Sequence, residues 1–253
     1  MKLTKAARHD EILAQITQQP SLRVAELATR LRVSTETIRR DLDELTGQGL
    51  VNRTYGGAVP MRGAEPSVGE RHGLFVAERE RIARAASARI KPGALLMIGS
   101  GATTTHVARR IAVEHKGLTV ITHSFSVATV LSLNPTITVL MAPGNYLASE
   151  GATVGVHAAR FVHDFSADLA ILGASGLTSE GATDARLEPA AIFGALASRA
   201  AETMVVADHS KFDKVFPARY ASWRELDGLV CDQAPAGPLA ETLRRHGVEV
   251  TVA

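Results

Sequence analysis

Hydrophobic positions recur with a helical period through the first part of the chain. The stretches 10–18 and 24–31 each carry apolar residues three and four positions apart, the spacing of one buried helix face. A tight turn at residues 32–33 comes next, and Ser34 is placed to cap a third helix over residues 35–45. The pattern therefore predicts three short helices with a tight turn before the third.

From residue 76 onward, short apolar runs alternate with helical stretches. The runs are rich in β-branched residues and apolar on both faces, which is typical of strands inside a parallel sheet. We therefore expect an α/β domain, in which a mostly parallel sheet carries helices on both faces. The predicted strands are Leu95–Gly99, Leu118–Thr122, Ile137–Met141, Leu169–Gly173, Thr203–Ala207, Gly228–Cys231 and Val248–Val252. The predicted helices are Glu78–Ile90, Thr104–Glu114, Ser126–Ser132, Glu188–Ala201 and Leu239–His246.

The two patterns divide the chain into two domains. Residues 59–75 mix proline, glycine and charge without a period, which is typical of a linker. We therefore expect a small helical domain over residues 1–58, a linker over residues 59–75 and the α/β domain over residues 76–253.

The composition is that of a soluble protein: of 253 residues, 45% are hydrophobic and 21% are charged. The uncharged apolar stretches are too short to span a bilayer, and no charged-then-apolar signal segment opens the chain. Cys231, the only cysteine, lies in an apolar run and is expected to be buried. These features predict a cytoplasmic protein without a membrane partner.

The exposed face of the third predicted helix is polar and basic. The net charge of +2 lies entirely in the first sixty residues, which weakly supports an anionic partner there. A helix of this kind after a tight turn fits the major groove of DNA, and a two-stranded wing over residues 50–59 would bring Arg53 near the DNA backbone. A three-helix bundle with a solvated arginine pair fits the same residues. The polar positions are Ser34, Thr35, Thr37, Arg39 and Arg40.

The turn after the first predicted strand has the sequence GSGATTT, residues 99–105. Its glycines let backbone approach an anion, and its amides and hydroxyls stand at a helix start. Lys211, after another predicted strand, adds the positive charge that a phosphate requires. The spacing is not that of a kinase-type or dinucleotide-binding loop. An anion site and a tight turn without a ligand both fit this pattern.

Several segments resemble one family. VSTETIRRDL (33–42) and RTYGGA (53–58) closely resemble the winged helix-turn-helix of the DeoR family of bacterial transcription regulators. From residue 76 onward the chain resembles the sensor domain of the same family, which is similar to ribose-5-phosphate isomerase and coenzyme A transferase folds. The matching segments there are SGATT (100–104), ITHS (121–124), ADLAILGA (167–174) and ADHSKF (207–212), with Gly144 after the third strand.

The resemblance implies a homodimer or homotetramer that binds double-stranded operator DNA and a phosphorylated sugar or related metabolite. It implies that Arg39 or Arg40 reaches base edges, with Ser34 and Arg53 on phosphate and Thr35 and Thr37 facing the DNA. Two positions depart from the family, which often has Asp in place of Gly99 and usually Asn in place of His123; Arg79 stands where Lys is common. The implied effector contacts are Ser100, Gly101, Ala102, Thr103, Thr104, His123, Gly144 and Lys211.

The same segments bear on catalysis. The related isomerases carry Asp-Gly-Ala-Asp where this chain has GASG (173–176), and an isomerase needs a carboxylate base over its substrate. We therefore predict a pocket that detects its ligand, with no catalytic residues and no cofactor. His157 and His163 lie six positions apart, so no metal site is expected. The leading hypothesis is a repressor; the alternatives are a sugar-phosphate enzyme with a DNA-binding arm and an architectural DNA binder.

Overall fold

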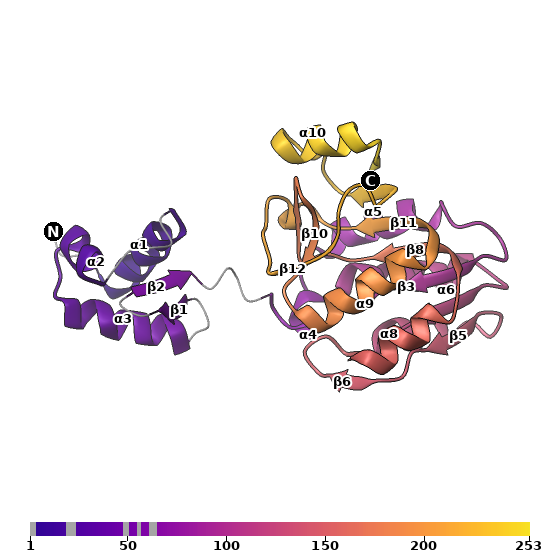
Figure 1. Ribbon diagram of the computed structural model, residues 1–253, viewed down its shortest axis with the longest axis horizontal. Coiled ribbons are helices and arrows are strands. Elements are labelled where there is room, and N and C mark those ends of the chain that lie inside the picture. The colour runs from indigo at the N-terminus through magenta and orange to yellow at the C-terminus, as the bar shows by residue number, and fades with distance from the viewer. Residues whose placement is uncertain (1–3, 19–23, 48–50, 55–56, 61–64) are drawn as a thin grey trace. The chain divides into compact units, whose positions relative to one another are not determined.

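The computed structural model divides the chain into two compact units, Met1–Glu65 and Pro66–Ala253. It describes residues 4–18, 24–47, 51–54, 57–60 and 65–253. Figure 1 draws the helices and strands of both units as ribbons.

Three helices form the first unit's core, namely α1 (Lys5–Gln18), α2 (Val24–Leu31) and α3 (Thr35–Gly47). The side-chain oxygen of Ser34 accepts the N–H of Thr37 at 3.1 Å and so caps α3. The predicted helices and the predicted cap are confirmed. The buried apolar residues are Ile12, Val24, Leu27, Ala28, Leu31, Ile38, Leu42 and Leu45.

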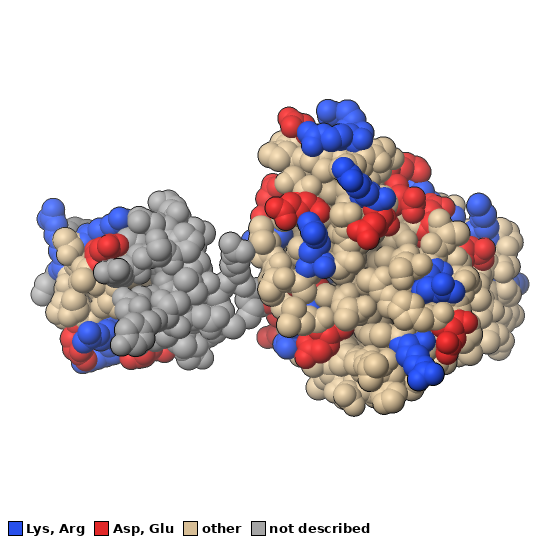
Figure 2. Space-filling model, viewed as in Figure 1, with Lys and Arg blue, Asp and Glu red and all other residues tan. Residues whose placement is uncertain are grey.

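A two-stranded antiparallel hairpin follows α3. In it β1 (Val51–Thr54) pairs with β2 (Gly57–Pro60), and Arg53 stands opposite Ala58. The predicted wing is confirmed for these strands; its residues 50, 55 and 56 lie outside the described residues. Figure 2 shows basic and acidic side chains close together on the described surface of this unit.

The second unit contains a seven-stranded sheet in which every pair of neighbours is parallel. The strand order is β14-β13-β11-β8-β3-β4-β5. All seven predicted strands are present in this sheet, which confirms the α/β prediction. Their bounds are β3 Leu95–Ile98, β4 Thr119–Thr122, β5 Thr138–Met141, β8 Ala167–Leu172, β11 Ala200–Val206, β13 Gly228–Cys231 and β14 Glu249–Val252.

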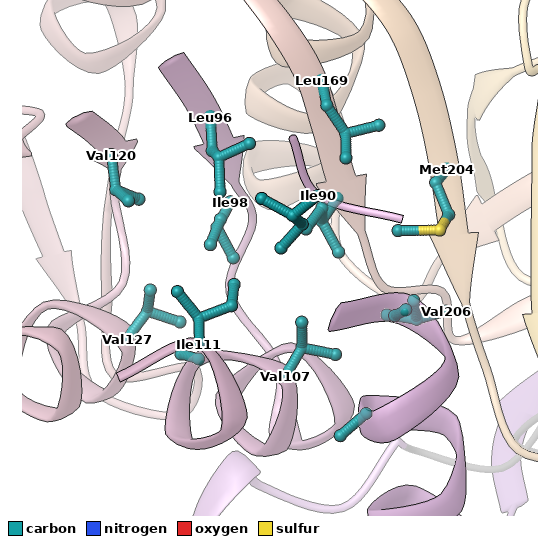
Figure 3. Close-up of a cluster of buried hydrophobic side chains, with 14 of the residues drawn as sticks. Ile90, Leu96, Ile98, Val107, Ile111, Val120, Val127, Leu169, Met204 and Val206 are labelled. Carbon is teal, nitrogen blue, oxygen red and sulfur yellow. The ribbon is translucent and has the colours of Figure 1, made fainter. Parts of the chain in front are cut away.

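Helices cover both faces of this sheet, because successive strand residues point to opposite sides. Leu96 and Ile98 pack against α5 (Val76–Ser87), α6 (Ala102–Glu114) and α7 (Phe125–Leu131), as Figure 3 shows in part. Met97, between them, lies in the opposite layer with α8 and α9. The bounds of the remaining helices are α8 Val156–His163, α9 Leu187–Ser198 and α10 Gly237–His246.

Short elements at the edges of the unit were not predicted. A hairpin joins β6 (Asn145–Leu147) to β7 (Ala152–Val154), with antiparallel pairing. A small antiparallel sheet has the order β12-β10-β9, and Trp223 packs in the cluster beneath it. Its bounds are β9 Gly176–Thr178, β10 Gly181–Asp184 and β12 Ala218–Ala221.

The second unit begins earlier than the predicted boundary at residue 76. Ser67 and Glu70 form a capping box at the start of α4 (Val68–Arg71), and Val68 is buried. Residues 66–75 of the predicted linker therefore belong to the second compact unit, because their polar residues cap a packed helix. Residues 61–64 of the predicted linker lie outside the described residues.

Candidate functional site

A pocket lies beside the carboxyl ends of the central strands. From β3 the chain continues outward through β4 and β5, and it then returns to the other side of β3 with β8. Ligands of open parallel sheets bind at such a reversal, because the loops there separate to opposite sides. The pocket is lined by Arg71, Arg79, Ser100, Gly101, Ala102, Thr103, Glu150, Gly173, Ala174, Asp184, Phe193 and Lys211.

The loop after β3 forms one wall of this pocket and leads into α6. Gly101 precedes the helix with a φ of 137°, a backbone conformation that favours glycine. Its carbonyl accepts the hydroxyls of Thr104 at 3.0 Å and Thr105 at 2.7 Å. Gly101 has no side chain to cap the helix, so no side-chain oxygen occupies the first amides of α6. Such a helix start is suited to binding an anion.

His123 lies beneath this loop and positions it. Its Nε2 accepts the N–H of Ser100 at 3.0 Å, and its Nδ1 donates to the carbonyl of Thr153 at 2.8 Å. This hydrogen bonding assigns the neutral ring with its proton on Nδ1. Burial lowers the pKa of His123 to about 4, against the opposing effect of the hydrogen bond to Thr153. The ring therefore supports Ser100 as a neutral group with both nitrogens engaged.

Basic side chains also line this pocket. Lys211 ends the 3₁₀ helix η1 (His209–Lys211), whose N-cap is Asp208. The Oδ2 atom of Asp208 accepts two hydrogen bonds from Arg79, one from Nη2 at 3.2 Å and one from Nε at 3.3 Å. Arg79 is 2% exposed and Asp208 is 0% exposed, so this ion pair is buried. Arg79 and Lys211 thus bring two positive charges to one pocket.

Two charged residues of the pocket, Arg71 and Glu150, were missed in the sequence, and Asp184 lies with them in the lining. Arg71 ends α4 and donates through Nη2 to Oε2 of Glu150. Asp184 ends β10, and its Oδ1 accepts the N–H of Arg186 at 2.8 Å. The capping-box spacing of residues 67–70 was an available signal for the helix that carries Arg71. Glu150 lies in the turn between β6 and β7, and no local pattern marks it.

The pocket brings together only some of the residues implied by the resemblance. Ser100, Gly101, Ala102, Thr103 and Lys211 line it, and so does Arg79. Among the described residues, Thr104, His123 and Gly144 do not belong to the lining. Thr104 bonds to Gly101 within the loop, and His123 supports the loop through Ser100. A Cβ on Gly144 would lie 2.6 Å from the carbonyl oxygen of Val154, so glycine there permits close approach to β7. Direct contacts to a ligand stay predictions for all eight.

Gly99, one of the two departures from the family pattern, has a packing reason. A Cβ at this position would lie 2.8 Å from Cε1 of Phe193 and 3.4 Å from Cδ2 of Leu172. Phe193 also meets the ring of His123 edge-on, with centroids 5.7 Å apart. The aromatic ring therefore occupies the space that a side chain at residue 99 would need.

The start of α3 presents its polar side chains to solvent, whereas Ile38 is buried. Arg39 and Arg40 are exposed, and Arg39 Nη1 lies 3.9 Å from Glu36 Oε2. Among the other residues predicted to contact DNA, Ser34 and Thr35 are exposed, Thr37 is half-buried and Arg53 lies in β1. A polar helix face with two exposed arginines and a neighbouring hairpin is the geometry of a DNA-reading winged helix.

Asp41 anchors this helix from its other side. Its carboxylate accepts Arg8 Nε at 2.5 Å and Nη2 at 2.9 Å, and it lies 3.2 Å from Nε2 of His9. Burial raises the pKa of Asp41, but the hydrogen bonds from Arg8 and His9 outweigh that effect and leave the pKa below its usual value. The carboxylate therefore stays charged and joins α1 to α3.

Cys231 is buried as predicted, and burial raises the pKa of its thiol to about 12. Within the part of the chain that the structure describes, no cluster of three or more His, Cys, Asp or Glu residues is arranged to hold a metal ion. None of the helices described has the length and apolar character needed to cross a membrane.

Comparisons with known proteins identify the family. A family model described as the DeoR-like helix-turn-helix domain matches residues 8–62, and one described as the DeoR C-terminal sensor domain matches residues 75–233. The HTH-type transcriptional repressor CsqR of Escherichia coli K12 is 31% identical over 98% of this chain and 96% of its own. The glycerol-3-phosphate regulon repressor of the same organism is 30% identical over 99% of each chain.

The chain therefore belongs to the DeoR family and is a DNA-binding transcriptional regulator. A putative aga operon transcriptional repressor of Escherichia coli O157:H7 is also 30% identical, over 96% of this chain and 92% of its own. Among solved structures, ribose 5-phosphate isomerase A from Methanocaldococcus jannaschii resembles 54% of this chain over 54% of its own, at 17% identity and a TM-score of 0.38.

Proposed function

We propose that this regulator represses transcription from an operator and is released when a phosphorylated sugar or related metabolite occupies the pocket of the second unit. Relatives that span nearly the whole chain are named repressors, one of a glycerol-3-phosphate regulon. The ligand would bind the released arrangement more tightly than the operator-bound one and so shift the population.

One observation carries the choice of ligand. The uncapped start of α6 and the cations Arg79 and Lys211 face a single pocket at the reversal of strand order. Backbone amides at a helix start and fixed cations together match a phosphate. In this proposal Ser100 and Thr103 donate to phosphate oxygens, and Lys211 neutralises the dianion. Asp184, on the same pocket, accepts a hydroxyl of the sugar.

A thermal-unfolding screen tests the proposal directly. Trp223 is the only tryptophan of the chain and is 1% exposed, so its fluorescence reports unfolding of the second unit. The panel is inorganic phosphate, glycerol 3-phosphate, ribose 5-phosphate, glucose 6-phosphate and fructose 6-phosphate. A ligand at 100 times its Kd adds about 2.7 kcal/mol of stability. Lys211→Gln should lose that gain, whereas Arg84→Gln, at an exposed site on α5, should keep it. A flat response of the wild-type protein to the whole panel contradicts the proposal.

The proposed DNA contacts use residues 1–58. Arg39 or Arg40 reads base edges, Thr35 and Thr37 face the groove, and Ser34 and Arg53 contact phosphate. Half-sites related by a two-fold axis require at least a dimer, so we propose a homodimer or homotetramer acting on DNA in the cytoplasm. Selection from a random DNA pool with the full chain should enrich a palindrome. Binding that falls with salt but enriches no sequence would indicate an architectural binder instead.

A second candidate, a sugar-phosphate enzyme, is favoured by the two carboxylates of the pocket, Glu150 and Asp184. Glu150 is already engaged with Arg71, and Asp184 accepts the N–H of Arg186. We propose that these groups bind ligand and hold the loops without abstracting a proton. Incubating the panel with purified protein and following the sugars by NMR tests this, since turnover of any of them would favour the enzyme.

A further inference from the structure

We propose that Arg71 is an additional effector-binding residue, and that its exchange of Glu150 for the effector's anion transmits ligand binding to the segment that leads toward the DNA-binding unit. This inference rests on the proposed function above. It assigns a role to α4, which begins two residues after the start of the second unit at Pro66.

Arg71 is placed as a ligand-binding group. It is 8% exposed, and it lines the pocket together with Lys211 and Arg79. Its Nη2 donates to Oε2 of Glu150, whose other oxygen lies 3.8 Å from Nε of Arg186. A guanidinium binds a phosphate in the same forked geometry as a carboxylate. An entering phosphate therefore competes with Glu150 for Arg71.

The attachments of α4 make this competition consequential for the helix. α4 has only four residues, and the N–H of Val68 donates to the carbonyl of Ser149 at 2.8 Å. The carbonyl of Arg71 accepts Nη1 of Arg79, itself a pocket residue. The α4 backbone is thus bonded on one side to the turn that carries Glu150 and on the other to a pocket arginine. A change in the Arg71–Glu150 pair acts on both attachments.

A second contact joins the same segment to the site. Phe75, just before α5, has a φ of 50°, which is unusual for a residue other than glycine. Its ring meets that of His209 edge-on, with centroids 5.3 Å apart. His209 begins η1, which ends at Lys211, and its Nδ1 lies 2.6 Å from Oδ2 of Asp232. Both ends of the segment 68–75 therefore contact elements that line or support the pocket.

The first experiment measures affinity in the full chain, with the Trp223 signal and the phosphate panel. Arg71→Gln should raise the Kd for the stabilising sugar phosphate, and the Kd for inorganic phosphate, by about tenfold or more. Losses of this size are expected when one charge-assisted hydrogen bond is removed. Glu150→Gln should lower both Kd values several-fold because the carboxylate that competes for Arg71 is gone. Arg84→Gln, an exposed arginine on α5, is the matched control and should leave both unchanged.

The second experiment separates transmission from binding. A duplex selected by the wild-type protein is titrated with each variant at saturating sugar phosphate, at fixed ionic strength. Lys211→Gln should need more ligand yet still release the duplex, whereas Arg71→Gln should stay bound even when its pocket is filled. Glu150→Gln should bind the duplex several-fold more weakly than wild type without any ligand.

The outcomes distinguish the two proposals. If no member of the panel stabilises the wild-type protein, both are overturned. If the wild-type protein responds and Arg71→Gln has the same Kd and the same release, only the role of Arg71 is overturned. Loss of Arg71 leaves a buried Glu150 without this partner, so the double variant Arg71→Gln/Glu150→Gln is measured as well. It should fold, bind phosphate weakly and fail to release the duplex; wild-type release from it would also overturn the inference.

Discussion

Replacing His123 by Asn, the residue usual at this place in the family, should remove a defined part of the protein's acid sensitivity. The folded protein holds His123 neutral, with a pKa of about 4 compared with an ordinary value of 6.5. Between these values the unfolded chain binds a proton at this site and the folded chain does not. Stability contributed by neutral His123 is therefore complete above pH 6.5 and is lost as the pH falls toward 4.

The magnitude follows from the two pKa values. Each tenfold difference in proton affinity is worth about 1.4 kcal/mol, so the full loss below pH 4 is about 3 kcal/mol. At pH 5 most unfolded chains carry the proton, and the loss there is about 2 kcal/mol. Asn does not titrate, and its amide can accept from Ser100 and donate to Thr153 as the imidazole does. Between pH 7 and pH 5, the free energy of unfolding of His123→Asn should therefore fall by about 2 kcal/mol less than that of wild type.

Urea unfolding followed by Trp223 fluorescence measures this difference. Wild type and His123→Asn are each compared at pH 7 and pH 5, so any cost of the substitution itself cancels. His106, whose pKa burial also lowers to about 4, is present in both proteins and cancels as well. Equal losses of stability in the two proteins would show that His123 is not held neutral, and the account of how it supports Ser100 would be wrong.

Three further predictions concern other parts of the molecule. Arg40→Ala should weaken binding to the selected duplex by about 1–3 kcal/mol and relax its sequence preference, as measured by fluorescence anisotropy; unchanged affinity and preference exclude a base contact. Asp41→Asn breaks a buried ion pair with Arg8 and should destabilise the first unit by about 3 kcal/mol, so duplex binding falls while the Trp223 transition stays in place. Gly99→Ala should cost about 1–3 kcal/mol in urea unfolding because its Cβ meets Phe193. Phe193→Leu should then lower the free energy of unfolding by less in the Gly99→Ala protein than in the wild-type protein. Equal decreases in the two proteins would refute the clash.

The sequence was sufficient for the seven strands of the parallel sheet and for most helices, but not for α8, although Ala158 and Val162 of that helix are buried. The central strands are unbroken apolar runs, and the first three helices have one apolar stripe each, so burial alone identified them. Shorter elements were not predicted for two reasons. The strands β6 and β7 have three residues each, and β10 pairs with β12, which is distant in the sequence. A three-residue strand has too few positions for a period to appear.

The candidate site divides in the same way. The loop at 100–103 and Lys211 follow strands that the apolar pattern had located, so their meeting at one end of the sheet was predictable. Arg71 was hidden because its segment carries the glycine and charge of a linker, although the spacing of Ser67 and Glu70 marks a helix start. Glu150 reaches the pocket only through a turn fixed by tertiary contacts, which no local pattern encodes.

The two proposed recognition surfaces differ in how the sequence encodes them. The exposed positions at the start of α3 fall within residues 34–40 and lie outside the buried cluster of their unit. The pocket is instead assembled from segments scattered between Arg71 and Lys211. A new DNA preference at the proposed DNA contacts therefore requires changes in one short stretch of sequence, whereas a new ligand preference of the proposed pocket requires coordinated changes in several separate segments. Paralogues of this architecture should diversify their target sequences faster than their chemical inputs.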